Sequence, residues 1–237
     1  MAQRPSAVPR PSRGRLGHTS SQEPVQGKTR RFFLPSVVQN VGGIVLCGGW
    51  SARMGTAKEW LPIGKEHLLQ RIVRIVGSVV RPVVVASRRE QPLPVLPPDV
   101  EVVYDAVENT GPLAGIAAGF EALAGRCEAA LVVSCDHPLL KPAFITRLIE
   151  LLGDHQAVVP SHEARSYPLV AVYRLDLRPL LAELLARGER RVRAFAERCG
   201  AQVVSSADLL DVDPTLDSLR NVNDRESHER ALRDSSA

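Results

Sequence analysis

The chain has 237 residues, enough for one domain with an extension, and its formal net charge at pH 7 is +4. That charge is concentrated at the N-terminus: residues 1–40 hold seven basic residues and one acidic residue, whereas the rest holds 23 basic and 25 acidic residues. The body therefore lacks the basic excess of a nucleic-acid-binding surface, and no apolar run reaches the roughly 18–20 residues of a membrane span.

The N-terminal segment is rich in Pro, Ser, Gly and Arg and has almost no large apolar residues up to residue 30. Because such a composition cannot bury enough surface to offset the entropy of ordering, we expect residues 1–40 to be a disordered extension and residues 41–237 to form a single domain. The segment also lacks the continuous apolar stretch of a secretory signal. None of the four cysteines is in a CxxC pair, and we expect a cytoplasmic protein with reduced thiols.

From residue 41 onward, short β-branched runs alternate with patterns of apolar residues at helical spacing. The runs predict strands at 43–47, 82–87, 100–104, 129–134, 156–160, 169–173 and 201–206. The helical patterns cover 67–80, 113–125, 143–153, 175–188, 192–200 and 224–234. Buried strands that alternate with helices indicate an α/β fold with a mainly parallel sheet covered on both faces.

The first predicted strand ends in a glycine-rich loop. Gly48 and Gly49 allow the backbone to approach a ligand closely and to point N–H groups at an anion, while Arg53 and Lys58 supply positive charge for phosphate oxygens. The loop matches neither GxxxxGK[ST] nor GxGxxG. It is thus a candidate triphosphate site, and the alternative is a structural turn with solvated basic residues.

The third predicted strand is followed by Asp105 and then by "TGPLAGIAAGF". Asp105 can accept hydrogen bonds from ribose hydroxyls or can simply form a turn. Pro112 suits a first helical turn. The small residues after it admit a flat ligand or another backbone, and we attribute Ala118 and Gly119 to tight packing of the helix on the sheet.

Asp136 directly follows the fourth predicted strand, where a carboxylate is costly unless it is paired or bound to a cation. Mg²⁺ takes one or two protein carboxylates and completes its octahedron with phosphate oxygens and water. A neighbouring phosphate loop therefore favours a metal role for Asp136 over a helix-capping role.

Four stretches at strand ends together resemble one family: "LCGGWSARMGTAK", "DAVENTGPLAGIAAGF", "VVSCDHPLL" and "NVND". They are similar to the pattern of the molybdenum cofactor guanylyltransferases, which reads L-A-G-G-x-S-x-R-M-G-x-D-K, then D…G-P-L-A-G, then C-D-x-P, then N-[VI]-N. The match runs in order from about residue 43 to 233. The combination of R-M-G with G-P-L-A-G is strong evidence for this family, whereas C-D-x-P alone is shared by many sugar nucleotidyltransferases.

The resemblance implies a three-layer α/β/α Rossmann-like nucleotidyltransferase fold with a mainly parallel mixed sheet. It implies transfer of GMP from GTP to molybdenum-loaded molybdopterin, with Mg²⁺ as cofactor. The implied catalytic residues are Arg53, Lys58 and Asp136, and the implied metal ligands are Asp136 and Asn223, with Asn221 as the alternative to Asn223. The implied GTP-binding residues are Leu46, Cys47, Gly48, Gly49, Lys58, Ser87, Asp105, Gly111, Gly115 and Asp136.

Two departures from the family pattern bear on these roles: Cys47 replaces Ala, and Ala57 replaces the Asp that precedes Lys58. The alternatives are a cytidylyltransferase acting on the same pterin, a sugar- or polyol-phosphate nucleotidyltransferase, and a catalytically inactive nucleotide-binding adaptor. "GPLAG" favours the guanylyl branch, and Arg53, Lys58 and Asp136 favour an enzyme. Candidate protein partners are molybdopterin-carrying and molybdoenzyme maturation proteins. Arg165 is a candidate contact for the anionic acceptor, and the alternative is a solvated loop.

Overall fold

The computed structural model describes residue 38 and residues 40–48, 57–104 and 111–234. By its contacts the chain divides into two units, residues 1–34 and 35–237, and all described residues belong to the second. Within those described ranges no helix is both long and apolar enough to span a bilayer.

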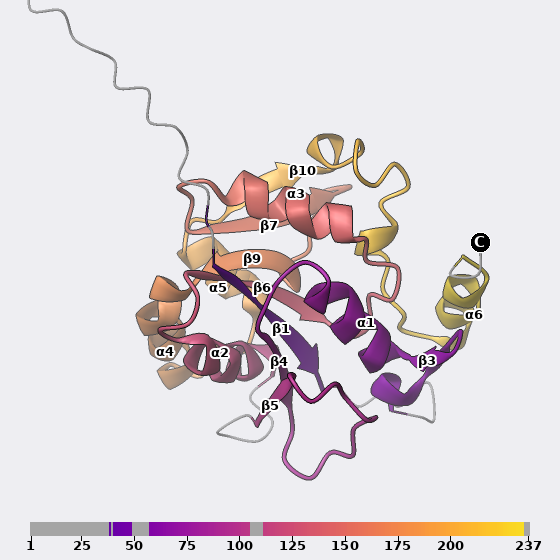
Figure 1. Cartoon of the computed structure of the whole chain (residues 1–237). Helices are drawn as coiled ribbons and strands as arrows, with labels where there is room; N and C mark the ends of the chain where they lie inside the picture. The colour runs from indigo at the N-terminus through magenta and orange to yellow at the C-terminus, as the bar shows by residue number, and fades with distance from the viewer. Residues whose placement is uncertain (1–37, 39, 49–56, 105–110, 235–237) are drawn as a thin grey trace, which may run out of the picture. The chain divides into compact units, whose positions relative to one another are not determined.

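The described strands form a central sheet with the order β10-β7-β9-β6-β1-β4-β5, and β8 pairs with β7 at one side. The labels follow this order from top to bottom of Figure 1. All neighbours are parallel except β9 and β8, which run antiparallel to their partners. The expected mainly parallel mixed sheet is thus confirmed. The bounds are β1 (Val41–Cys47), β4 (Val83–Ser87), β5 (Glu101–Tyr104), β6 (Ala129–Ser134), β7 (Ala157–His162), β8 (Arg165–Ser166), β9 (Val170–Arg174) and β10 (Gln202–Ser205).

Helices cover both faces of this sheet (Figure 1). On one face, α1 (Leu68–Gly77) and α3 (Pro142–Leu152) pack against side chains such as Val45. On the other, α2 (Pro112–Leu123), α4 (Arg178–Ala186) and α5 (Val192–Arg198) pack against Ile44 and its neighbours. Successive residues of β1 thus enter opposite cores, as the two-residue period of a strand requires. The three-layer α/β/α architecture is confirmed.

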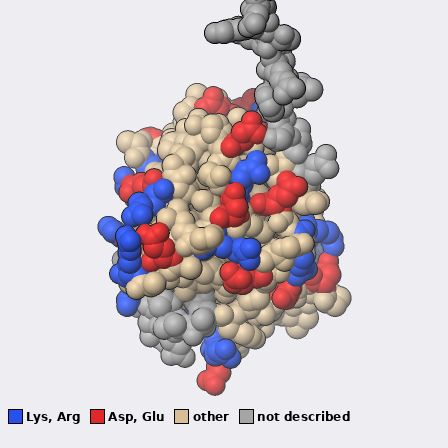
Figure 2. Space-filling model, turned by 90° about the vertical axis from the view of Figure 1, so that its left-hand side faces the viewer, with Lys and Arg blue, Asp and Glu red and all other residues tan. Residues whose placement is uncertain are grey.

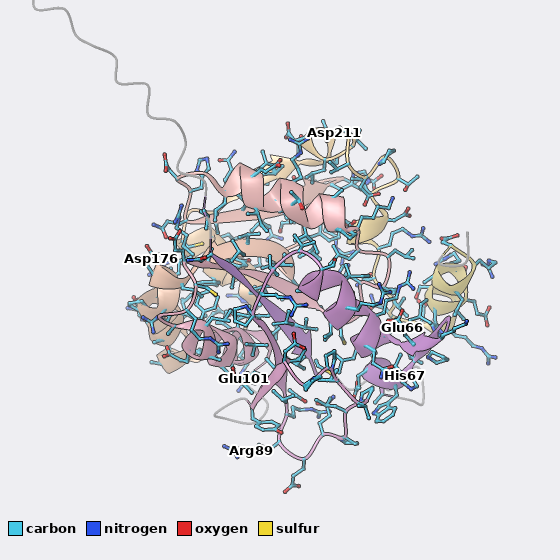
Figure 3. All side chains as sticks on the ribbon, in the orientation of Figure 1. Glu66, His67, Arg89, Glu101, Asp176 and Asp211 are labelled. Carbon is cyan, nitrogen blue, oxygen red and sulfur yellow. The ribbon has the colours of Figure 1, made fainter. Side chains whose placement is uncertain are left out.

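A small arm beside this sheet was not predicted. The short helix η1 (Lys58–Trp60) leads into a hairpin of β2 (Pro62–Ile63) and β3 (Glu66–His67), and α6 (Arg225–Asp234) packs on it through a third apolar cluster. Glu66 and His67 lie on this arm beside α1 in Figure 3. Glu66 accepts a 2.7 Å bond from Arg74, and His228 lies 2.6 Å from the carbonyl oxygen of Pro62. Two-residue strands carry too little alternation to be seen in a sequence.

Charged side chains are intermingled on the side of the molecule shown in Figure 2. Several arginine side chains on the helices form ion pairs with glutamate side chains. Arg187 pairs with Glu183 one turn away at 2.9 Å, and Arg178 pairs with Glu121 at 3.5 Å. Basic side chains gather along the left-hand edge of Figure 2, and elsewhere on that side the two signs of charge alternate.

Glycines allow the helices to approach the sheet closely. A Cβ added to Gly119 would lie 2.7 Å from Cδ1 of Ile44, and one added to Gly43 would lie 2.4 Å from Cγ1 of Val76. Both neighbouring side chains are fully buried, so neither can swing out into solvent. The sequence interpretation of Gly119 as a packing residue is confirmed.

We therefore expect Gly119→Ala to destabilise the protein even though alanine is the better helix former. Overpacking costs roughly 1–3 kcal/mol, against a gain of at most about 1 kcal/mol in helix propensity. Gly77→Ala is the matched control, because its Cβ would meet Val83 at an ordinary 3.7 Å. Urea unfolding should show a lower free energy for Gly119→Ala and an equal or higher one for Gly77→Ala. Equal effects of the two substitutions would contradict this packing argument.

Candidate active site

The predicted site residues that the structure describes gather at the carboxyl ends of the parallel strands. β1 lies inside the sheet between β4 and β6. The chain first adds β4 and β5 on one side of β1 and then crosses to β6 on the other. Open α/β sheets bind ligands in the crevice at such a reversal. Gly48 follows β1 and Asp136 closely follows β6, so the candidate phosphate loop begins beside the candidate metal ligand.

Lys58 joins three segments that are far apart in the sequence. Its Nζ donates to Oδ2 of Asp136 at 2.9 Å and to Oδ1 of Asn223 at 2.8 Å. The Lys58 and Asp136 side chains are only 19% and 13% exposed. The backbone N–H of Val222 also donates to the carbonyl oxygen of Asp136 at 2.8 Å. The structure thus places three of the predicted residues in direct contact.

The carboxylate of Asp136 stays ionised although it is mostly buried. Burial by itself would raise its pKa, but electrostatic interactions with His137 and Lys58 and hydrogen bonds from Lys58 and Ser134 together hold the pKa below its ordinary value. The neighbouring imidazole behaves differently. Burial is the largest influence on His137 and lowers its pKa, although Asp136 and the carbonyl of Ser218 act in the opposite sense.

A buried clasp fixes the segment that leads to Asn223. Asp213 is fully buried and accepts from Lys141 Nζ at 2.6 Å and from the backbone N–H of Ser218 at 2.8 Å. The hydroxyl of Ser218 in turn accepts from the backbone N–H of Lys141 at 3.0 Å. The hydrogen bond with Asp213 raises the pKa of Lys141. Nothing in the sequence singled out this clasp, because its three residues are individually ordinary.

The predicted nucleotide-binding residues at the end of β1 can contact a nucleotide through backbone groups rather than through side chains. Leu46 and Cys47 are buried, and the carbonyl oxygen of Leu46 already accepts from the N–H of Cys135 at 3.0 Å. Gly48 is exposed. The hydrogen bond with Cys135, followed by burial, raises the pKa of the Cys47 thiol, which is therefore a neutral core residue.

The start of α2 adds two further predicted residues to this edge. Gly111 caps the helix with φ +77°, a conformation that favours glycine, and a Cβ there would lie 3.3 Å from the carbonyl oxygen of Arg190. Gly115 is buried in the first turns of the helix. A side chain at Gly111 would therefore be strained by its φ and crowded by Arg190.

The end of β4 is organised by a residue that the sequence did not reveal. Ser87 is buried, and its hydroxyl lies 3.2 Å from Oε1 of Gln91. Gln91 donates through Nε2 to the buried Glu59 at 2.5 Å and to Cys47 Sγ at 3.8 Å. Arg89, labelled in Figure 3, lies 5.9 Å from the ring centroid of Tyr104. A lone Gln in a loop carries no sequence signal of such a role.

Gly49, Arg53 and Asp105 lie outside the described residues. Their proposed contacts with phosphate and ribose stay predictions.

A cavity of about 290 Å³ opens directly beside Asp136. Arg165, Arg191 and Arg193 line it together with His137 and Asn221. The guanidinium groups of Arg191 and Arg193 are paired with Glu189 and Glu197. A larger cavity of about 1050 Å³ lies between α1 and the segment 95–100, and none of the predicted site residues lines it. Size alone therefore does not locate the site, whereas the chemistry of the walls does.

The residues at this edge fit a cation that is shared with a phosphate. In the described ranges no three His, Cys, Asp or Glu side chains are close enough to hold a metal by themselves. Asp136 and Asn223 nevertheless present two oxygens that already converge on a positive charge, the ammonium of Lys58. Mg²⁺ needs only one or two such oxygens when phosphate and water supply the rest.

Comparison with known proteins identifies the family. The MobA-like NTP transferase domain matches residues 43–203. The chain belongs to this family. It is also 33% identical over 200 residues to a protein of Methanosarcina mazei, covering 80% of this chain and 88% of that one. A protein of Mycobacterium avium is 35% identical over 196 residues, covering 81% and 94%. Both carry the name "Probable molybdenum cofactor guanylyltransferase".

Solved structures share the fold of this MobA-like chain. Molybdopterin-guanine dinucleotide biosynthesis protein A from Archaeoglobus fulgidus superposes with a TM-score of 0.70 at 22% identity, covering 82% of this chain and 98% of that one. The 2-C-methyl-D-erythritol 4-phosphate cytidylyltransferase of Thermus thermophilus superposes with a TM-score of 0.60 at 15% identity, covering 82% and 98%. The family resemblance read from the sequence and the nucleotidyltransferase fold are both confirmed.

The buried imidazole makes stability depend on pH in a definite direction. Because the pKa of His137 is lowered in the folded state, the unfolded chain takes up a proton below its ordinary pKa of 6.5 while the folded protein does not. The free energy of unfolding should thus fall on acidification through this range, by at most about 1.4 kcal/mol per pH unit from this group. The His137→Gln variant has no imidazole at this position, so its free energy of unfolding lacks this pH-dependent contribution.

Urea unfolding in EDTA at pH 7.5 and 5.5 measures the effect. The difference in unfolding free energy between the unmodified protein and His137→Gln should shrink at pH 5.5. His155→Gln, at an exposed position, should track the unmodified protein at both pH values. A pH-independent difference for His137→Gln would show that the imidazole titrates alike in both states.

Proposed function

We propose that this chain transfers GMP from GTP to the phosphate of molybdenum-loaded molybdopterin and releases pyrophosphate. The single observation that supports this most is the contact of Lys58 with Asp136 and Asn223 where the strand order of a MobA-like domain reverses. The names of the relatives supply the substrate class. We also propose a cytoplasmic location, because the acceptor of this reaction is a cofactor precursor.

The chemistry requires neither a covalent intermediate nor a general base. An oxygen of the acceptor phosphate, already a dianion, attacks the α-phosphorus of GTP, and the bond from that phosphorus to the bridging oxygen breaks as pyrophosphate leaves. Lys58 is proposed to neutralise charge that develops on the leaving phosphates, with the assistance of Arg53. Asp136, with Asn223, would hold Mg²⁺, which supplies further charge neutralisation when bound. The protein's task is then to orient the two phosphates in line.

We assign the acceptor phosphate to the cavity beside Asp136. Arg165, Arg191 and Arg193 line it, and a guanidinium binds phosphate oxygens in a forked geometry. The guanidinium of Arg165 also lies 5.1 Å from the ring centroid of Tyr167, which limits its freedom. An acceptor bound there would meet the α-phosphate next to Asp136.

Incubation of the protein with molybdenum-loaded molybdopterin, Mg²⁺ and each of the four nucleoside triphosphates tests the proposed function. We expect a guanine dinucleotide product and metal-dependent pyrophosphate release with GTP only. A cytosine product would assign the chain to the cytidylyl branch. Nucleotide binding without any pyrophosphate would instead identify an inactive adaptor.

Lys58→Ala should lower kcat more than it weakens GTP binding, because the ammonium meets charge that grows as the leaving group departs. Lys58→Arg should restore activity only in part, since a planar fork does not replace a compact ammonium. The measurements are kcat and the Kd of GTP for both variants. Weaker GTP binding at unchanged kcat would make Lys58 a ground-state anchor instead.

Arg165→Ala should raise the KM for the acceptor roughly tenfold or more while the Kd of GTP stays the same, since a lost charge-assisted hydrogen bond costs about 1.5–3 kcal/mol. Arg126→Ala is the matched control: it removes an exposed guanidinium whose partner is Glu101 and that lines no part of this cavity. If both variants keep the original acceptor KM, the acceptor binds elsewhere.

A further inference from the structure

His137 occupies the variable position of the C-D-x-P stretch and has a defined orientation in the structure. Its side chain is only 6% exposed, yet it reaches the wall of the cavity beside Asp136. Nδ1 lies 3.2 Å from the carbonyl oxygen of Ser218. A carbonyl oxygen only accepts hydrogen bonds, so in the neutral imidazole the ring proton is on Nδ1 and Nε2 keeps its lone pair.

That lone pair faces the carboxylate of Asp136. Nε2 lies 3.7 Å from Oδ1, which is too far for a hydrogen bond, so the two atoms share no proton. Oδ1 is also the oxygen that Lys58 does not use, since Lys58 contacts Oδ2. Two electron-pair donors from consecutive residues therefore face each other beside the cavity.

This arrangement has the features of a metal-binding histidine. Imidazole ligands usually donate their other N–H to a backbone carbonyl or a carboxylate, which fixes the tautomer and the ring orientation, and Ser218 supplies that carbonyl here. With metal–ligand bonds of about 2.1 Å, two ligand atoms of one ion lie at most about 4.2 Å apart. The observed separation of 3.7 Å is within this limit, and an octahedral ion, whose adjacent ligand atoms lie about 3.0 Å apart, would need Nε2 and Oδ1 to approach by about 0.7 Å.

We infer that Nε2 of His137 and Oδ1 of Asp136 bind the same divalent cation, and that this pair favours a first-row transition-metal ion over Mg²⁺. An all-oxygen set suits Mg²⁺, whereas imidazole shifts preference toward ions that accept nitrogen. The inference rests on the proposed cation at Asp136 and adds His137 as a further protein ligand, together with the class of metal. The phosphates of GTP would compensate the positive charge of Lys58 nearby.

Pulsed electron paramagnetic resonance with Mn²⁺ as the probe tests the inference directly. The full chain is produced with ¹⁵N-labelled histidine and mixed with Mn²⁺ and unlabelled GTP, so that guanine nitrogens give no ¹⁵N signal. We expect a ¹⁵N coupling to the bound Mn²⁺ that disappears in His137→Gln and persists in His155→Gln. Competition with Mg²⁺ should show that His137→Gln reduces the preference for Mn²⁺ about tenfold or more.

The possible results separate the inference from the proposed function. Mn²⁺ that binds in an Asp136-dependent manner without any ¹⁵N coupling in the unmodified protein would overturn the role of His137 and leave the cation at Asp136 in place. Mn²⁺ binding that is unaffected by Asp136→Asn would overturn both. The decisive spectrum is that of the unmodified protein, so the result does not depend on whether His137→Gln folds; its melting temperature establishes whether it does.

Discussion

The ammonium of Lys58 lies between the carboxylate of Asp136 and the amide oxygen of Asn223, and the geometry of the site depends on this contact. The Lys58 and Asp136 side chains are largely shielded from water, so removing either would leave its partner as an uncompensated charge in a low-dielectric setting. The arm that carries Lys58, the loop after β6 and the start of α6 must therefore form together.

Several weaker interactions bring these three segments into place. The N–H of Val222 binds the carbonyl oxygen of Asp136, and the clasp around the buried Asp213 holds the chain that leads to Val222. A charge buried as completely as that of Asp213 is tolerated only when it is paired and hydrogen-bonded, as it is here. On the other side, the apolar cluster under α6 anchors the hairpin that follows Lys58.

The contact also explains how the chain accommodates its departure from the family pattern at Ala57. Ala57 is exposed and makes no side-chain capping bond to η1. Lys58 nevertheless has two oxygen partners, and both come from the other parts of the site. The orientation of the lysine is therefore fixed across the crevice rather than by its neighbour in the sequence. The second departure, Cys47, places a small neutral thiol in the core, where an alanine also fits.

The sequence by itself determined the strands and helices of the sheet, the layers and the family, because each element carries its own period and the four motifs stand at strand ends. It also identified Lys58, Asp136 and Asn223, although not that they touch. Only the tertiary structure revealed Gln91, the clasp at Asp213 and the lone pair of His137. These roles arise from contacts between residues as many as 81 positions apart in the chain, and a contact of that kind leaves no pattern in a single sequence.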